Sequence, residues 1–452
     1  MTLFDLRKKH PEFVYERFLI REEENKIQVK FHFTLRPNIT FYPRLEFPKP
    51  SKKLESQKLN VFIFHIGLIE ILSYWKAACP QVITIKAGFL TEEQIKWWKK
   101  LLVNGMGEFF YKNQIDFTSD DFVRFNVKSN NRYDKFTDTR LDRSLVMVGG
   151  GRDSVVSLEI LKEAGEKMAS MMLEPSIAAR ESGRVAAVSK SAIVTRTLDP
   201  TLLKLNSEGY LNGHTPFSAV LAFVGVASAM LHNFRRVVAS NEASSNEVNT
   251  HYLGHEINHQ YSKTYHFEAT FRDYMQKFLS PHLEYYSLAR PLYELQLSKI
   301  FSHYPQYFLK VKSCNVNQKD NSWCCQCPKC LFIYASLYPF LENDKVTEMF
   351  GEDLYQNASL YDVAEQLILD SREKPFECVG TKEESLTAFY LSLKKAKQKN
   401  RKLPILLQLI QEKIIAKEQN LDDRAQKITS HWNNEHFIPK HIAEILYQKV
   451  EL

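Results

Sequence analysis

The stretch VMVGGGRDSVV (Val146–Val156) places three consecutive glycines between two apolar runs and follows them with Arg-Asp-Ser. Residues 144–148 have the composition of a buried strand, and residues 154–164 carry apolar side chains at the spacing of one helix face. A strand, a glycine turn and a helix start form an anion site, because backbone N–H groups and the helix dipole face the same point. A tight turn in which Asp153 or Ser154 caps the helix is the alternative.

The segments after the glycine loop alternate between strand and helix patterns. Strands are predicted at residues 167–174, 191–198 and 234–240, and a long helix is predicted from Thr215. This alternation favours an α/β fold with a doubly wound parallel sheet. The uncharged residues 214–233 form a short stretch that contains polar side chains, so they indicate a buried helix and not a membrane span.

The sequence motif of the glycine loop indicates which type of phosphate-binding loop it resembles. The Walker pattern G-x-x-x-x-G-K-[ST] and the dinucleotide pattern G-x-G-x-x-G are both absent. The pattern G-G-x-D-S at residues 150–154 resembles the pyrophosphate loop of the ATP pyrophosphatase (PP-loop) superfamily, whose members cut ATP between the α and β phosphates and adenylate a substrate. Gly149 stands where that loop usually begins with serine, so one hydroxyl donor is missing.

The rest of the chain predicts three regions. An N-terminal α+β domain (1–135) contains a strand pattern at residues 26–35 and a helix pattern at residues 90–105, with Thr91 as the expected N-cap. A PP-loop ATP-binding domain with a four-cysteine site (136–345) follows a polar boundary segment. Residues 346–452 are predicted to be mostly helical.

Composition and charge set limits on the class of protein. The 452 residues include 44% apolar and 25% charged residues, which is typical of a soluble globular chain. The net charge of +7 suits an anionic substrate or a polyanion. The densest basic run, Lys394–Lys402, is interpreted as a helix end or loop and not as a nucleic-acid contact. No signal-peptide pattern opens the sequence, so a cytoplasmic protein is expected.

Five of the seven cysteines crowd into SCNVNQKDNSWCCQCPKC, and four of them are candidate metal ligands. Cys324, Cys327 and Cys330 follow C-x2-C-x2-C spacing, and Cys314 lies upstream. Four thiolates suit a tetrahedral structural zinc, with an iron–sulfur cluster or plain buried or reactive thiols as alternatives. Cys325 is expected to face away. The arrangement resembles the four-cysteine zinc site of 7-cyano-7-deazaguanine synthase, another PP-loop protein.

Several polar segments supply candidates for acid–base chemistry. Glu242 lies in SNEASSNEVN after a predicted strand, where open α/β sheets bind ligands, although this composition also suits a surface loop. His259 and Lys263 offer acid–base groups and phosphate partners. Arg290 precedes a proline at a predicted helix start and could clamp a phosphate or form a surface ion pair. Cys378 is a lone cysteine, for which packing is the plainer explanation.

Taken in order, the segments resemble one family. They comprise GGGRDSVVSLEILKEAG, LNGHTPFSA, NEASSNEVN, NHQYSKTYHFE, SLARPLYELQ, WCCQCPKC and KPFECVGT, with HIGLIEILSYWKAACP and GMGEFFYKNQIDF upstream. Together they resemble the ATP-dependent UDP-N-acetylmuramoyl-L-alanyl-L-glutamate epimerases of peptidoglycan (cell-wall) synthesis, over about residues 60–385. The departures are Gly149 in place of serine and Arg152 where lysine is commoner, and the forked guanidinium would alter the phosphate contact.

The resemblance implies inversion of the terminal L-glutamate of a UDP-linked muramoyl dipeptide to D-glutamate. A free α-carboxylate resists loss of the α-proton, and adenylation by ATP removes that negative charge. Pyrophosphate and AMP are released, and a base and an acid move the proton on opposite faces.

The resemblance also implies ATP, Mg²⁺ and a structural Zn²⁺ as cofactors, with no nucleic-acid or membrane partner. Phosphate binding would fall to Gly149, Gly150, Gly151, Arg152, Asp153, Ser154 and Arg290. Asp153 would also hold Mg²⁺. Zinc would be bound by Cys314, Cys324, Cys327 and Cys330. The candidates for catalysis are Cys378, His259, Lys263 and Glu242.

Two other functions compete with this interpretation. A PP-loop enzyme that thiolates tRNA, or that adenylates another carboxylate or base, is compatible with the basic charge and the cysteines. It would need an RNA-binding appendage or a separate persulfide cysteine, and neither is evident in the sequence. A nucleotide-binding module without catalysis is the third possibility.

Overall fold

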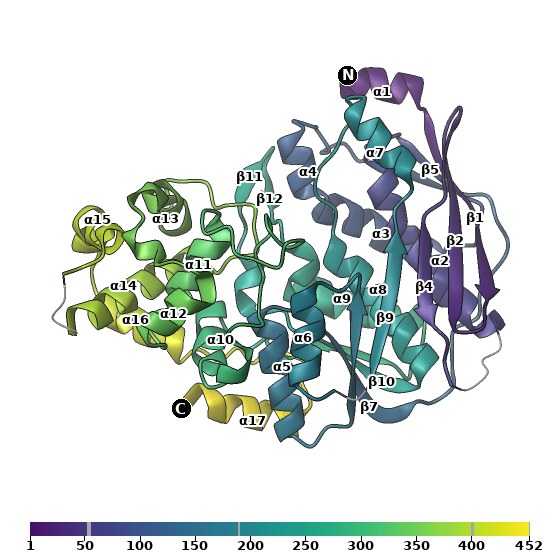
Figure 1. Cartoon of the computed structure of the whole chain (residues 1–452). Coiled ribbons are helices and arrows are strands. Elements are labelled where there is room, and N and C mark those ends of the chain that lie inside the picture. The colour runs from purple at the N-terminus through teal and green to yellow at the C-terminus, as the bar shows by residue number, and fades with distance from the viewer. Residues whose placement is uncertain (52–55, 189, 399–401, 452) are drawn as a thin grey trace.

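The computed structural model describes residues 1–51, 56–188, 190–398 and 402–451 (Figure 1). Part of the basic run Lys394–Lys402 therefore lies outside the described residues. The described part of that run belongs to the end of helix α14 (Lys382–Gln398) and to the segment before α15 (Ile405–Lys413).

Five parallel strands carry the glycine loop. Their order in the sheet is β13 (Glu284–Ser287), β10 (Phe234–Ala239), β7 (Leu141–Met147), β8 (Met168–Leu173) and β9 (Ser191–Thr197). The chain runs outward from β7 to β9 and then resumes at β10, on the other side of β7. This part of the sheet is therefore doubly wound, as predicted, and its switch point lies between β7 and β10.

The same sheet continues into the N-terminal region and becomes mixed. Beyond β9 the order is β4 (Arg44–Pro48), β2 (Lys26–Leu35), β1 (Glu12–Glu22), β5 (Val82–Ile85) and β6 (Arg124–Val127), with β3 (Ile39–Phe41) paired to β2. The strand β4 pairs antiparallel with both β9 and β2. The eleven-stranded sheet thus spans the predicted boundary at residue 135, because hydrogen bonds between β4 and β9 join the two regions.

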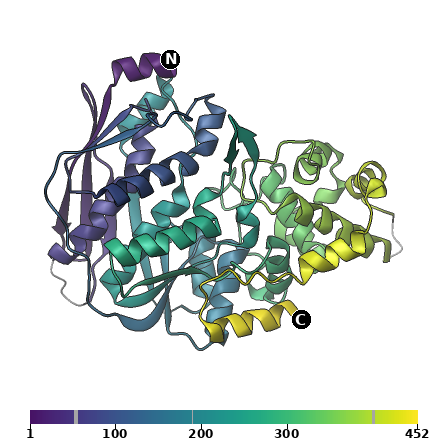
Figure 2. The same cartoon turned by 180° about the vertical axis from the view of Figure 1, so that it is seen from behind.

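Two apolar helices pack side by side on one face of this sheet. They are α2 (Ser56–Trp75), which contacts β1, and α8 (Phe217–His232), which contacts β10. Figure 2 shows this face, whereas α5 (Arg152–Glu163) and α6 (Ile177–Val185) cover the opposite face in Figure 1. The helix predicted at residues 214–233 is α8, and most of its side chains are buried, as predicted. Among the described residues, Gln57–Trp75 is long and apolar enough to cross a membrane, but 89% of it is buried within the protein.

The predicted helix at residues 90–105 is α3 (Glu92–Gly105). Thr91 caps it, as predicted, and the Gln94 side chain completes the capping box. After α3 come the short helix α4 (Gly107–Lys112), and later the hairpin β11 (Thr250–Tyr252)–β12 (His255–Ile257) and α9 (Tyr265–Phe278). The β11–β12 hairpin lies between the α/β part and the C-terminal helices, whereas α9 lies against the sheet and contacts β13 (Figure 1).

The C-terminal part of the chain is helical, as predicted. Its helices are α12 (Asn343–Phe350), α13 (Tyr361–Ile368), α14, α15, α16 (Leu421–Thr429) and α17 (Lys440–Glu451), and α10 (Glu294–Phe301) and α11 (Pro328–Leu337), which precede the predicted boundary at residue 346, pack with them. Buried aromatic side chains such as Tyr334, Tyr355 and Phe389 fill their shared core. The last helix, α17, returns to pack against α5, so the end of the chain contacts the α/β part (Figure 1).

Candidate active site

A cavity of about 410 Å³ lies at the carboxyl ends of β7, β8 and β10. It is lined by Gly149 of the glycine loop, by Leu173 at the end of β8, by Asn241 after β10, and by Lys263. This is the switch point of the doubly wound sheet, where open α/β folds bind their ligands. Asp153 and Ser154 also line this cavity, so the motif and the cavity coincide.

The glycine loop has a conformation that its sequence requires. Gly150 has φ +89°, and a Cβ there would lie 2.6 Å from the backbone nitrogen of Ala179. Only glycine fits this approach of the loop to α6. The N-cap of α5 is Gly151, and no side chain makes a capping hydrogen bond to the first turn. The alternative in which Asp153 or Ser154 caps the helix is therefore wrong, and no side-chain cap covers the helix N-terminus.

Arg152 is not placed for the phosphate contact that the sequence suggested. Its side chain is 3% exposed and points to the helical region, where it pairs with Glu294 at 2.7 Å. It also donates hydrogen bonds to Ser298 and Ser336. Because these groups occupy the guanidinium, Arg152 ties α5 to α10 and α11 and does not line the cavity.

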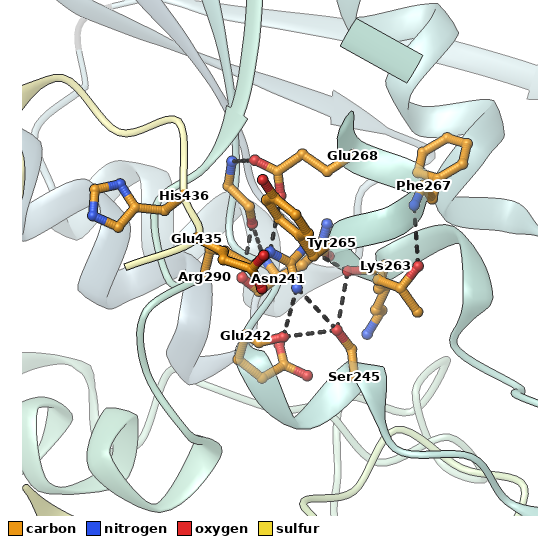
Figure 3. Close-up of polar contacts among 12 residues, drawn as sticks. Asn241, Glu242, Ser245, Lys263, Tyr265, Phe267, Glu268, Arg290, Glu435 and His436 are labelled. Carbon is orange, nitrogen blue, oxygen red and sulfur yellow. Dashed lines mark hydrogen bonds and ion pairs between the residues drawn. The ribbon is translucent and has the colours of Figure 1, made fainter. Parts of the chain in front are cut away.

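Arg290 is likewise a connecting residue and not an exposed clamp. Its guanidinium is fully buried and pairs with Glu268 at 2.9 Å (Figure 3). It donates to the backbone oxygens of Glu242, at 2.8 Å, and Lys263, at 2.5 Å. Arg290 therefore holds together the two loops that carry Glu242 and Lys263. The sequence could not distinguish this role from phosphate binding, because arginine suits both.

Three predicted catalytic residues meet beside the cavity. The Lys263 ammonium donates to the Cys378 sulfur at 3.2 Å. Burial would raise the pKa of the Cys378 thiol, but Lys263 and the neighbouring His259 lower it to about 5. Burial would lower the pKa of His259, but Cys378 and Glu108 raise it to about 9. At neutral pH the group is therefore a thiolate held between two cations.

Lys263 joins this group to the cavity. Burial opposes its charge, yet the nearby Cys378 and Glu242 hold the pKa of Lys263 above its ordinary value. Because Lys263 lines the cavity and also contacts Cys378, a ligand in the cavity would lie next to the thiolate.

Glu242 is the second unusual titratable group. It is 2% exposed, and its Oε1 accepts no hydrogen bond from any residue that the structure describes. Burial and the neighbouring Glu294 raise the pKa of Glu242 to about 8, against the opposing effect of Lys263. A buried carboxyl group with this pKa is neutral at pH 7 and can donate a proton.

Two residues of this site were not predicted as site residues from the sequence. Glu108 of α4 contacts His259 at 2.5 Å, and His214 lies 3.6 Å from the same carboxylate. Both belong to segments, GMGEFFYK and LNGHTPFSA, that carried the family resemblance without suggesting a role. Their only sequence signal was polar or charged side chains inside apolar or glycine-containing segments, which is too common a pattern to identify a site.

The four predicted zinc ligands come together in the structure. The sulfurs of Cys314, Cys324, Cys327 and Cys330 all lie within 4.8 Å of one another, with Cys327–Cys330 at 3.5 Å and Cys324–Cys330 at 3.8 Å. Zn–S bonds of about 2.3 Å in a tetrahedron place sulfurs roughly 3.8 Å apart, so the donor set fits such an ion. Cys325 faces away, with its sulfur 3.5 Å from the Phe350 carbonyl oxygen.

Comparison with known proteins gives a consistent result over most of the chain. Residues 5–288 match the family described as MurL N-terminal domain, and residues 310–425 match the MurL C-terminal domain. The chain is 34% identical to proteins named UDP-N-acetyl-alpha-D-muramoyl-L-alanyl-L-glutamate epimerase from a Micromonospora species, Xanthomonas oryzae pv. oryzae and Salinispora tropica. These matches cover 75%, 74% and 77% of this chain and 76%, 75% and 77% of the respective relatives. No solved structure shows significant similarity.

Proposed function

The chain belongs to the MurL family of epimerases, and from that premise we propose that it inverts the terminal L-glutamate of UDP-N-acetylmuramoyl-L-alanyl-L-glutamate through ATP-dependent adenylation of the α-carboxylate. The product would carry D-glutamate for peptidoglycan synthesis, and AMP and pyrophosphate would be released. ATP and UDP-linked precursors are cytoplasmic compounds, so we place the reaction in the cytoplasm.

The observation that carries this proposal is the cavity at the switch point of the sheet. The N-terminus of α5 lacks a side-chain cap, and so does the N-terminus of α8, whose first residues Phe217 and Ser218 line the same cavity. Two uncapped helix N-termini and the Lys263 ammonium favour a polyanion such as a triphosphate. Asp153, a carboxylate among these positive groups, is the residue we propose for Mg²⁺, which would offset the phosphate charge.

We assign proton transfer to Cys378 and Glu242. Inversion requires one group that accepts the α-proton and another that donates a proton from the opposite face. Cys378 is ionised and suited to accept, whereas Glu242 is neutral and suited to donate. Lys263 interacts with both residues and stays charged, so it would stabilise the negative charge that develops on the activated substrate.

Inversion is expected to speed up as pH rises through about 5 and to slow as pH rises through about 8. The first limb reflects formation of the Cys378 thiolate, and the second reflects loss of the Glu242 proton. The measurement is kcat/KM for solvent deuterium incorporation at the glutamate α-carbon in the L-to-D direction, with pyrophosphate release as the control. A profile without the alkaline fall would remove Glu242 from the role of acid.

The proposal is tested by supplying ATP with different acceptors and measuring AMP and pyrophosphate. Release that depends on the muramoyl dipeptide, together with appearance of D-glutamate, is the expected result. Release that depends on tRNA would favour a PP-loop tRNA-modifying enzyme. If neither acceptor gives turnover, the protein would be a nucleotide-binding module without catalysis.

We propose a structural zinc ion at the four cysteines. Cys327 is the N-cap residue of α11, and the first turn carries Lys329, whose ammonium donates to the Cys378 carbonyl oxygen. The backbone nitrogen of Lys329 donates to Glu377, at 3.1 Å. The metal would therefore fix the segment that holds Cys378, at a distance from the chemistry.

The purified protein is expected to contain about one zinc ion per chain, because four thiolates bind this metal tightly. Elemental analysis of the wild type and of Cys330→Ser measures it, and the variant is expected to lose both the zinc and thermal stability. Cys325→Ser is the matched control, since Cys325 lies in the same segment but faces away from the cluster. Iron in place of zinc, or an unchanged zinc content in Cys330→Ser, would contradict the assignment.

A further inference from the structure

Glu108 reaches the site from the N-terminal part of the chain. It lies on α4, and its Oε2 is 2.5 Å from Nδ1 of His259, with both side chains about 15% exposed. The backbone nitrogen of His259 is fixed separately by the Asn249 side chain, at 2.8 Å. Glu108 is therefore the group that sets the rotation of the imidazole ring. With Nδ1 bound to Glu108, Nε2 is left for the side of Cys378.

The helix α4 also contacts the segment that carries Cys378. The ring of Phe376, two residues before Cys378, stacks on Tyr111 with centroids 5.5 Å apart. The Lys112 ammonium lies 4.4 Å from the centroid of the same ring. One short helix thus holds the cysteine segment on one side and the histidine ring on the other, and these contacts are independent of each other.

The contact between Glu108 and His259 is a hydrogen-bonded ion pair and not the start of a metal site. Two ligands of one zinc ion, each about 2.1 Å from the metal, lie roughly 3 Å or more apart. Oε2 and Nδ1 are closer than that. His214 is the third group in this cluster, and burial and the neighbouring His259 lower the pKa of His214 to about 3, so it adds no charge.

We propose that Glu108 is a positioning residue for Cys378: it holds His259 in the orientation that keeps the cysteine ionised for proton transfer. This inference rests on the proposed role of Cys378. The groups that face the imidazole are Glu108, His214 and Cys378, and Lys76 and Lys263 act on His214. Among them Glu108 is the carboxylate that bonds directly to the ring. Without it, His259 would lose both its orientation and part of its positive charge.

The test compares Glu108→Gln, Glu108→Asp and the wild type by two measurements. The first is the pH dependence of alkylation of Cys378 by iodoacetamide, quantified for that residue by mass spectrometry. In Glu108→Gln the midpoint is expected to rise by about one pH unit or more, and in Glu108→Asp it is expected to recover most of the way. Glu93→Gln, an exposed carboxylate on α3, is the control and should match the wild type.

The second measurement is deuterium incorporation at the glutamate α-carbon. Glu108→Gln is expected to lower it about tenfold or more, while pyrophosphate release changes little. An unshifted alkylation midpoint in Glu108→Gln would overturn the inference, even if activity fell. If the wild type shows no inversion, the proposed function fails, but the alkylation shift still decides whether Glu108 acts through His259.

Discussion

Replacing Cys378 with alanine is expected to lower glutamate inversion about 10²- to 10⁴-fold while ATP-dependent pyrophosphate release continues. The reason is that Cys378 is not among the residues that line the cavity, and its sulfur accepts a hydrogen bond from the cavity residue Lys263, at 3.2 Å. Loss of the thiolate would remove the proton acceptor without altering the glycine loop. The measurements are chiral analysis of glutamate after hydrolysis of the product, and a coupled assay for pyrophosphate.

Cys378→Ser tests whether inversion depends on the ionisation of the side chain or only on its size. Serine is nearly the same size as cysteine, but its hydroxyl group does not ionise near neutral pH, so this variant should lose inversion almost as fully as alanine. Thermal unfolding of both variants should be measured alongside, since the thiolate is held between Lys263 and His259. Full epimerase activity in either variant would eliminate Cys378 as the base.

Replacing Asp153 with alanine is expected to impair adenylation, the step before inversion, and to lower pyrophosphate release about 10²- to 10³-fold. Asp153 lies in the first turn of α5 and lines the cavity. It also contributes to the negative potential that keeps Lys263 charged. Its removal would take away the proposed Mg²⁺ ligand, so both pyrophosphate release and inversion should fall together.

Two controls make the Asp153 result specific. Asp153→Asn keeps the shape of the side chain and should fail nearly as badly if charge is what matters. Glu163→Ala, at the opposite end of the same helix, removes an exposed carboxylate and should leave the activity intact. Pyrophosphate release at the full rate in Asp153→Ala would show that this carboxylate has no part in ATP chemistry.

Local patterns predicted much of the fold. The strand at residues 26–35, the Thr91 cap and the buried helix α8 all follow from side-chain periodicity and capping chemistry, which depend on near neighbours in the sequence. The pairing of β4 with β9 could not be predicted in this way. This pairing places Leu45 opposite Arg196, far apart in the sequence. The alternation of apolar and polar side chains along a strand does not determine which other strand will pair with its edge.

The candidate site also has features that the sequence predicted and features that it did not. The glycine pattern located the cavity, because close backbone approach at Gly150 leaves a direct trace in the sequence. Arg152 and Arg290 form ion pairs with Glu294 and Glu268, which the sequence did not predict, since a guanidinium serves an ion pair as readily as a phosphate. Glu108 went unnoticed because its partner is 151 residues away in the chain.

Because β4 occupies the edge of β9, neither half of the sheet is a transferable module. A chain that began at residue 136 would leave the edge amides and carbonyls of β9 without partners, and it would uncover the side of α8 that α2 contacts. Such an edge recruits other chains, so truncation at this point would favour aggregation over a smaller working enzyme. The first 135 residues cannot be exchanged for another specificity domain without rebuilding the sheet and replacing the α4 contacts.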